Sequence, residues 1–393
     1  MADSHLPDAL LQARTGTSTI PIVPGQKGIR VSRRTQQLNS IGGSGLKLQE
    51  FPESTDEWRN QFVQREAAKS SECDIFGSNV TWTAGLAQRG FIYDLSPYVQ
   101  CRASDFIPST VKTGEYKGSD WAVPFGTNVA FMYYRTDQIA KAPATWQEAY
   151  ADGNASKGLI YQGSAYEGLT VNFLTLASAA GGAVLSADGT KSAINSPENL
   201  KALTFMVDGL SNGSVPKAVL TYTEEESRRA FEAGQASLMV NWTYADVLGQ
   251  QSDIAGKFQA VPLPSWEGGA SSGSGVLGGV NLVVSKYSAH PAEALKAIDQ
   301  ITSLDSQVIA ATKGQAPTLV KAYDSSQVQQ ALPFWEVLEK GVSQATSRPV
   351  TPVYAQVSQA IYTNVSAALS GQVTPADALK KADEQINQAL STF

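Results

Sequence analysis

Residues 224–241 read EEESRRAFEAGQASLMVN, and the pattern in this stretch decides the fold. Its first part, Glu224–Ala233, is rich in residues that favour a helix. Gly234 ends that helix, because glycine readily adopts the left-handed conformation found at helix ends. The following run, Ser237–Asn241, has the short apolar character of a buried strand. A helix, a glycine and a strand in succession form the repeating unit of α/β proteins.

The same alternation extends over most of the chain. Expected strands cover 18–23, 46–51, 74–76, 121–125, 129–134, 159–162 and 237–241. Expected helices cover 29–41, 54–70, 166–180 and 224–233, with capping-box starts at Ser54 and Thr145. Residues 271–279 are rich in Gly and Ser and indicate a flexible crossing, and the sequence turns mostly helical after Pro291. The pattern predicts α/β layers with a mainly parallel sheet.

Composition excludes several classes of protein. The chain has 393 residues, long enough for two or three domain-sized cores, and a net charge of -6. An acidic surface repels phosphate backbones, so we expect no nucleic-acid partner. No window approaches the roughly 18 consecutive apolar residues that span a bilayer.

Two cysteines, Cys73 and Cys101, and two histidines, His5 and His290, limit the chemistry that this chain can carry. They are too few for a disulfide scaffold or a thiolate metal cage. One disulfide and two buried thiols both fit the sequence. The histidines lie far apart in the sequence, so we expect neither a catalytic base nor a metal ligand, and no cofactor.

Catalysis is not expected either. No histidine accompanies a Gly-x-Ser-x-Gly turn, which argues against a nucleophilic triad. A glycosidase needs two facing carboxylates. Asp74, Glu167 and Glu225 are candidates, but a chain with 36 acidic residues forms such pairs easily. The sequence favours a binding protein, with a glycoside-modifying enzyme as the alternative.

Aromatic residues beside polar residues or glycine point to a carbohydrate. Trp82, Trp121, Phe125, Trp242 and Tyr244 fall near expected strand ends, where α/β sheets bind ligands. A pyranose ring has apolar C–H faces, which aromatic rings cover, and an equator of hydroxyls, which polar side chains satisfy. Each ring taken alone also fits core packing, so the prediction of a carbohydrate ligand depends on the five aromatic residues together.

Several motifs, in order, resemble the family-1 extracellular solute-binding proteins of ABC sugar importers, the maltose-binding-protein-like group. The motifs are FPESTDEWRN (51–60), DIFGSNVTWTA (74–84), WAVPFGTN (121–128), YYR (133–135), YEGLT (166–170), NWTYA (241–245), GGVN (278–281) and SRPVTP (347–352), with Glu224–Phe231 preceding NWTYA. The resemblance covers about 46–393, and the branch it resembles most binds trehalose and maltose. It implies a two-lobed periplasmic-binding-protein-like fold of type II, with a ligand cleft between the lobes.

The resemblance also implies domain limits. Lobe 1 would comprise 1–127 and about 280–320, and lobe 2 would comprise 128–279 and about 321–393. The hinge crossings would lie near 125–128, 275–280 and 320. Ligand capture would close the lobes, because a ligand that contacts both favours the closed state.

Site residues follow from the motifs position by position. The implied ligand-binding residues are Asn79, Asn128, Tyr166, Glu224, Glu225, Trp242, Tyr244, Gly278 and Arg348. The register leaves the choice between Glu224 and Glu225 open. Trp242 would stack on the sugar, Gly278 would offer a backbone contact, and Arg348 would bind vicinal hydroxyls or an acid partner. The alternatives are a surface salt bridge for Arg348, a turn or hinge cap for Asn128, and packing between lobes for Trp242.

Two positions depart from the family pattern. Asn79 stands where this branch usually has an aspartate, so it adds donors where an aspartate only accepts. Val280 stands where the family often has an aromatic residue, which implies that the cleft is wider on this side. The first 45 residues match the family's usual opening poorly.

The implied function is to capture a sugar, such as trehalose or maltose, and to deliver it to an ABC permease. A sugar-sensing module for a signalling receptor is an alternative, and a polyol, an aminosugar or a glycerophosphodiester are alternative ligands. The first residues, MADSH, lack the features of a signal peptide, so taken alone they fit either a cytoplasmic protein or one whose export signal has been removed. The family implies an exported monomer, periplasmic or a cell-surface lipoprotein, from which the signal has been removed.

Overall fold

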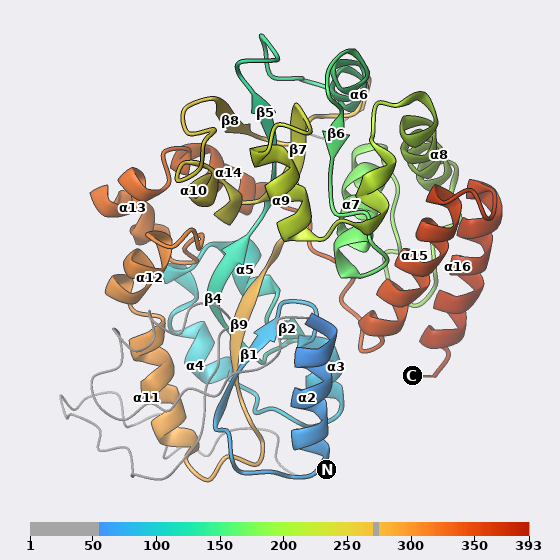
Figure 1. Cartoon of the computed structure of the whole chain (residues 1–393). Coiled ribbons are helices and arrows are strands. Elements are labelled where there is room, and N and C mark those ends of the chain that lie inside the picture. The colour runs from blue at the N-terminus through green and yellow to red at the C-terminus, as the bar shows by residue number, and fades with distance from the viewer. Residues whose placement is uncertain (1–54, 270–274, 393) are drawn as a thin grey trace. The chain divides into compact units, whose positions relative to one another are not determined.

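The computed structural model describes residues 55–269 and 275–392, which divide into two compact units (Figure 1). Unit 1 contains the described residues up to Asn128 together with Gly278–Trp335. Unit 2 contains the described residues of Val129–Leu277 and those from Glu336 onward. The elements expected at 18–23, 29–41 and 46–51, and the cap at Ser54, lie outside the described residues.

Unit 1 is built from short helices around a small sheet. Its first segment forms α2 (Thr55–Ala67), β1 (Ile75–Asn79), α3 (Thr83–Gln88), α4 (Ser96–Gln100), the 3₁₀-helix η2 (Ala103–Asp105), α5 (Pro108–Lys112), β2 (Glu115–Tyr116), β3 (Ser119–Asp120) and β4 (Val123–Asn128). Its second segment forms β9 (Gly278–Val284), α11 (Pro291–Ile301), α12 (Leu304–Ala311), η4 (Val320–Asp324) and α13 (Ser326–Ala331).

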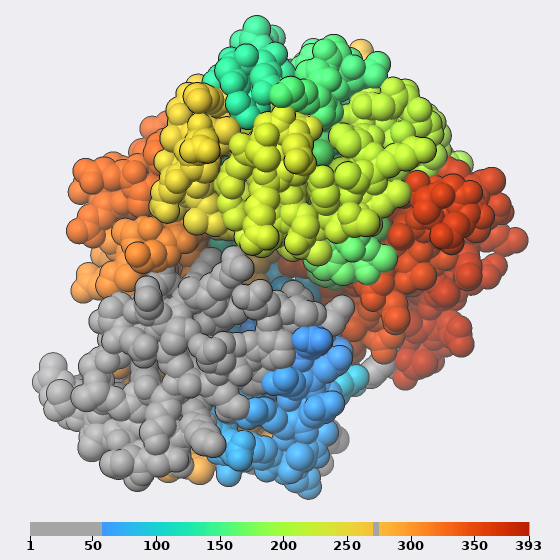
Figure 2. Space-filling model, in the orientation of Figure 1, coloured from blue at the N-terminus to red at the C-terminus, as the bar shows by residue number. Residues whose placement is uncertain are grey.

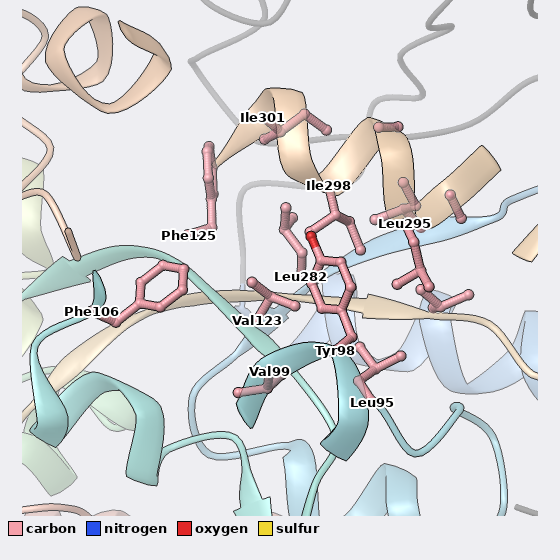
Figure 3. Packing of buried hydrophobic residues seen from close by; sticks show 14 of the residues in the cluster. Leu95, Tyr98, Val99, Phe106, Val123, Phe125, Leu282, Leu295, Ile298 and Ile301 are labelled. Atoms are coloured by element: carbon pink, nitrogen blue, oxygen red, sulfur yellow. The ribbon is translucent and has the colours of Figure 1, made fainter. Parts of the chain in front are cut away.

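The core of unit 1 lies on both faces of an antiparallel sheet in the order β1-β9-β4. Successive side chains of a strand point to opposite faces. Leu282 and Val284 of β9 therefore pack with Tyr98 of α4 and Leu295 of α11, as Figure 3 shows for Leu282, Tyr98 and Leu295. A sheet covered on both faces needs consecutive apolar residues in its strands, and Ile75–Phe76 of β1 and Leu282–Val284 of β9 provide them.

The second face of this sheet packs on α2 and α3. Val283 of β9 and Phe76 of β1 join Phe62 of α2 and Leu86 of α3. The rings of Phe62 and Phe76 stack with their centroids 4.0 Å apart. Complete burial of one such side chain contributes roughly 1.5–3 kcal/mol to the stability of the unit.

Unit 2 has longer helices and a second sheet. Its first segment forms β5 (Ala130–Arg135), α6 (Trp146–Ala155), β6 (Leu159–Ile160), α7 (Glu167–Ala179), α8 (Pro197–Asn212), η3 (Lys217–Thr221), α9 (Glu224–Glu232), β7 (Leu238–Trp242), α10 (Tyr244–Gly249) and β8 (Phe258–Val261). Its last segment forms α14 (Trp335–Gln344), which starts at the boundary between the units, α15 (Tyr354–Leu369) and α16 (Pro375–Leu390). The hairpin of α15 and α16 packs on α7 and α8, and Figure 2 shows it in red beside α8 in yellow-green.

The direction of the strands differs from the expectation of a mainly parallel sheet. In unit 2 the order is β6-β7-β5-β8, and β6 and β7 pair parallel while β5 pairs antiparallel with both neighbours. Among the described residues β6–β7 is the one parallel pair of strands. A parallel pair needs a long crossover, which α7–α9 provide here. The strands β5 and β9 start directly at boundaries between the units, and β5, β8 and β9 run antiparallel to the strands named here as their partners β7, β5, β1 and β4.

Local sequence signals explain several element ends. Thr145 caps α6 by accepting a hydrogen bond from the backbone N–H of Glu148 at 3.1 Å. Gly213 ends α8 in the left-handed conformation, with φ of 88°. Cys73 and Cys101 are both thiols, the first buried and the second exposed. No helix within the described part of the chain is long and apolar enough to cross a membrane.

Candidate functional site

Three residues that the sequence analysis selected lie at one end of the sheet in unit 1. The register pairs Asn128 of β4 with Gly278 of β9, and Asn79 of β1 with Val280 of the same strand. The three strands therefore bring Asn79, Asn128 and Gly278 to the same sheet edge.

Asn79 has one end of its side chain engaged locally. Its Oδ1 accepts hydrogen bonds from the backbone N–H and the hydroxyl of Thr81, at 3.1 and 3.0 Å. This Asx turn directs the chain from β1 toward α3. An aspartate at position 79 could accept the same two hydrogen bonds. The asparagine differs in also having an NH2 group, which can donate.

Gly278 and Gly279 lie where two backbones approach closely. The Gly278 carbonyl accepts a hydrogen bond from the Thr127 hydroxyl at 3.2 Å. Gly279 has φ of 137°, and a Cβ there would lie 2.4 Å from the carbonyl oxygen of Gly126. Only glycine fits at 279, because the backbone of β4 occupies the space that a side chain would need.

Other aromatic residues singled out in the sequence serve the core of unit 1. Trp82 and Phe125 are buried in its two hydrophobic clusters, and Trp121 packs against one of them. Trp82 also makes an edge-to-face contact with Trp58, with centroids 4.6 Å apart. Of the five aromatic residues that the sequence suggested for the site, these three therefore pack in or against the core of unit 1.

In unit 2, Tyr166, Glu224 and Trp242 meet. Tyr166 precedes α7, Glu224 is the first residue of α9, and Trp242 is the last residue of β7. The Glu224 carboxyl interacts with the Tyr166 hydroxyl and with the Trp242 side chain. Burial raises the pKa of Glu224 above its usual value, while both neighbours act in the opposite direction.

The start of α9 is fixed by its own sequence. A capping box joins Thr223 and Glu226, with the Thr223 N–H donating to the Glu226 carboxylate at 3.0 Å. Three consecutive acids at the first turn interact favourably with the helix dipole. The capping box therefore fixes the position of Glu224 at the start of α9 without help from a ligand.

Tyr166 is held by the glycine two residues later. A Cβ at Gly168 would lie 2.3 Å from the Tyr166 hydroxyl oxygen, so the ring packs directly over this glycine. The buried hydroxyls of Tyr166 and Tyr244 complete no hydrogen bond of standard geometry with the described residues. Each lies beside a carboxyl group, Glu224 and Glu225 respectively.

Glu225 differs from its neighbour Glu224 in having a cationic partner. Its carboxylate forms an ion pair with Arg228 at 3.0 Å, and Arg228 also contacts Glu232 at 2.5 Å. Tyr244 lies on the other side of Glu225. Glu225 thus belongs to an ion-pair network on α9, whereas Glu224 interacts with Tyr166 and Trp242.

Arg348 forms a buried ion pair with Glu167. Its Nη1 lies 2.6 Å from Glu167 Oε1, and the Arg348 side chain is 5% exposed. The same carboxylate accepts hydrogen bonds from Tyr354 at 2.6 Å and from Ser358 at 2.5 Å. Glu167 is therefore a shared acceptor that joins the start of α7 to α15 and to the SRPVTP segment.

Sequence reasoning missed part of this arrangement. It singled out Arg348 but not Tyr354 or Ser358, and it considered Glu167 only as one possible glycosidase acid. The signal was present in two motifs, YEGLT and SRPVTP, but nothing in the sequence alone joins residues about 180 positions apart.

Other features of the described residues do not suggest a second chemistry. No group of three or more His, Cys, Asp or Glu side chains within the described part is placed to hold a metal ion. An open groove of about 510 Å³ on unit 2 is lined by α8 residues, Gln147 and Trp266, and by none of the predicted site residues.

Three comparisons with known proteins match this chain. The family model described as bacterial extracellular solute-binding protein matches residues 49–308. A protein of Deinococcus radiodurans described as a probable ABC transporter-binding protein is 32% identical over 369 residues, which cover 88% of this chain and 86% of that protein.

Solved structures match along most of the chain. The structure of T. maritima MalE3 with bound maltose has a TM-score of 0.83 at 33% identity, covering 90% of this chain and 95% of that one. A solute-binding protein of an ABC transporter from Thermotoga lettingae, bound with α-D-tagatose, has a TM-score of 0.81 at 24% identity, covering 93% and 98%. At that identity the second match concerns the fold alone.

Proposed function

This chain belongs to the bacterial extracellular solute-binding proteins, and from that premise we propose that it captures a sugar and hands it to the permease of an ABC transporter. The members of this group that match it bind solutes and are not enzymes. The family resemblance and the two-lobed α/β fold expected from the sequence are confirmed. The proposal concerns the ligand, its contacts and the fate of the complex.

The proposed ligand is a disaccharide such as maltose or trehalose. One observation carries this proposal: unit 2 groups the Trp242 ring with the Glu224 carboxyl and the Tyr166 hydroxyl. A ring beside hydrogen-bonding groups suits the apolar face and the hydroxyl equator of a pyranose. The maltose bound to MalE3 of T. maritima gives additional support.

The proposed contacts divide into two kinds. In unit 2, Trp242 stacks on the sugar, Glu224 and the hydroxyls of Tyr166 and Tyr244 bind its hydroxyls, and Arg348 contributes its guanidinium group. We assign Glu225 a supporting part through Tyr244, because Arg228 already neutralises it. In unit 1, Asn79, Asn128 and Gly278 supply neutral contacts from one sheet edge.

A thermal-shift panel tests the ligand. Maltose, trehalose, tagatose, ribitol, glucosamine and glycerophosphocholine are each added to the full chain. A ligand that binds the native state raises the melting temperature, by an amount that grows with its concentration relative to Kd. We expect the largest rise with a disaccharide. A rise with ribitol, glucosamine or glycerophosphocholine alone would contradict the disaccharide proposal.

Trp242→Ala tests the site itself. We expect calorimetric titration with the disaccharide that gives the largest shift to show affinity at least several-fold weaker, because the stacking face is lost. Trp121→Ala is the control, since Trp121 is also a half-buried tryptophan but packs on a core cluster of unit 1. Equal affinities of Trp242→Ala and the unmutated chain would remove Trp242 from the site.

The lobe limits and hinge closure predicted from the sequence stay proposals, as do the monomeric state and the location in the periplasm or on a lipid anchor. Small-angle X-ray scattering with and without maltose tests two of them at once. A radius of gyration that falls on adding maltose supports closure, and the scattering mass gives the number of chains. A protein that binds maltose with an unchanged radius would argue against closure.

A further inference from the structure

We infer that Asn241 is a positioning residue that holds Trp242 and Glu224 in a fixed mutual arrangement, with Tyr133 as a second anchor for Trp242. The inference deepens the proposed sugar capture and rests on it for its consequence for affinity. Its structural content concerns unit 2 alone and is testable without any ligand.

The side-chain amide of Asn241 bonds to the backbone of both site residues. Its Nδ2 donates to the Glu224 carbonyl at 3.0 Å, and its Oδ1 accepts from the Trp242 N–H at 2.7 Å. Nδ2 also lies 3.1 Å from the Ser227 hydroxyl, and Asn241 is 1% exposed. A single buried amide therefore ties the end of β7 to the first turn of α9.

Tyr133 holds the opposite side of the Trp242 backbone. Its hydroxyl, on a fully buried ring of β5, donates to the Trp242 carbonyl at 2.8 Å. The backbone of Asp246 on α10 also hydrogen-bonds to the Tyr133 hydroxyl. The N–H and the carbonyl of Trp242 are thus both fixed by buried side chains, and its ring interacts with Glu224.

A chain of buried amides extends this support to Tyr166. Gln162 donates to the Ser227 hydroxyl at 3.0 Å and to the Val240 carbonyl at 2.9 Å. Asn172 of α7 donates to Gln162 and to the Gly168 carbonyl, the latter at 3.0 Å. Gly168 lies under the Tyr166 ring. The polar chain therefore connects the three elements that carry Tyr166, Glu224 and Trp242.

Such a network matters because its members are buried. A buried polar group that loses its partner keeps the cost of having left water, so a network of this kind is rigid when complete and weak when broken. Binding sites need their contacting groups held to a fraction of an ångström by surrounding side chains. Asn241 meets that need for two contacting groups at once.

The experiment follows the Trp242 ring directly by ¹⁹F NMR. The full chain is labelled with 5-fluorotryptophan, and Trp242→Phe identifies the Trp242 resonance among the seven tryptophans. Spectra are compared for Asn241→Ala, Tyr133→Phe and the control Asn199→Ala. Asn199 is also fully buried and donates to three backbone carbonyls, but it lies on α8.

The expected result separates positioning from stability. Asn241→Ala and Asn199→Ala both lower the melting temperature, but only Asn241→Ala shifts or broadens the Trp242 resonance in the ligand-free protein. Tyr133→Phe gives a smaller change of the same kind, and decides the question if Asn241→Ala does not fold. A Trp242 resonance that stays unchanged in every variant that folds would overturn the inference.

Titration with maltose tests whether the positioning by Asn241 affects ligand affinity. We expect Asn241→Ala to weaken maltose binding roughly tenfold, the factor that corresponds to about 1.4 kcal/mol, while Asn199→Ala leaves it unchanged. If the unmutated chain binds no maltose, the maltose part of the proposed function fails, and the Trp242 resonance still decides the role of Asn241. Equal weakening by Asn241→Ala and Asn199→Ala would contradict the positioning role.

Discussion

The candidate residues of unit 1 and those of unit 2 are held in place by different means. In unit 1, Asn79, Asn128 and Gly278 are placed by strand register, and the backbone contacts around Gly279 leave no room for a side chain. In unit 2, Glu224, Trp242 and Arg348 are placed by buried side-chain hydrogen bonds and an ion pair. Register tolerates changes of side chain, whereas a buried polar network depends on each member.

This difference indicates where substitutions should act. In unit 2 the loss of one side chain leaves another buried group without its partner, so stability and binding should fall together. In unit 1 side-chain changes should alter ligand preference with little change in stability, unless they disturb the backbone.

Glu167→Ala should break the unit 2 arrangement with the largest effect. It leaves the Arg348 guanidinium buried without its carboxylate, which typically costs about 3–5 kcal/mol. Urea denaturation measures the loss of unfolding free energy. Glu72→Ala is the control, because the Glu72 side chain that pairs with Arg65 is 66% exposed, and ion pairs at the surface contribute at most about 1 kcal/mol. Similar losses for both variants would mean that burial of the ion pair carries no special weight.

Gly279→Ala should break the unit 1 arrangement through its backbone. A Cβ at 279 would lie 2.4 Å from the Gly126 carbonyl oxygen, and strain and crowding together should cost about 2–4 kcal/mol. Gly118→Ala separates the two causes, because Gly118 also has a positive φ but nothing lies within 4 Å of its Cβ. Equal melting temperatures of the two variants would attribute the whole effect to φ.

Glu66 sharpens the comparison, since it is a buried carboxyl in unit 1. Burial raises its pKa to about 7, and the Ser285 hydroxyl, 2.8 Å away, offsets part of that rise. The folded state therefore binds more protons than the unfolded state. The free energy of unfolding should fall between about pH 4.5 and about pH 7, by up to about 3 kcal/mol, and then level off.

Glu66→Gln keeps a group able to bond to Ser285 but removes the titration. Its unfolding free energy should lack this fall, so its advantage over the unmutated chain should appear at pH 8 and vanish at pH 4. Urea denaturation at both values measures the difference. Curves that run parallel across this range would show that Glu66 does not titrate there.

Asn79→Asp should have the smallest effect on stability. Both side chains offer the oxygen that accepts from Thr81, so we expect the unfolding free energy to change by less than about 0.5 kcal/mol. The variant loses two donors and gains a charge, so the rank order of sugars in calorimetric titration should change. An unchanged rank order would place Asn79 outside the site.

Much of the fold could be predicted from the sequence. The helix and strand around Gly234, the cap at Thr145 and the helical C-terminal part all follow from local propensity and turn chemistry. Strand direction could not be predicted, because β9 pairs with β1 and β4 from a remote part of the chain. Local patterns show that a strand exists but not which neighbour it finds.

The candidate site was predicted in its parts but not in its connections. The motifs singled out Trp242, Glu224 and Arg348, but gave no means to choose between Glu224 and Glu225. That distinction arises from Arg228, one turn along α9, which pairs with Glu225. The part played by Asn241 was likewise hidden, since a buried amide is recognised by its partners and not by its neighbours in sequence.

The place of β9 in the chain also has a consequence for biosynthesis. β1 and β4 are made early, yet the strand that lies between them is roughly 200 residues downstream of β1. Until β9 emerges from the ribosome, β1 and β4 lack the strand that pairs with both of them, and unpaired strand edges invite pairing with other chains. Unit 1 therefore completes this sheet only after β5, β6, β7 and β8 of unit 2 have been made.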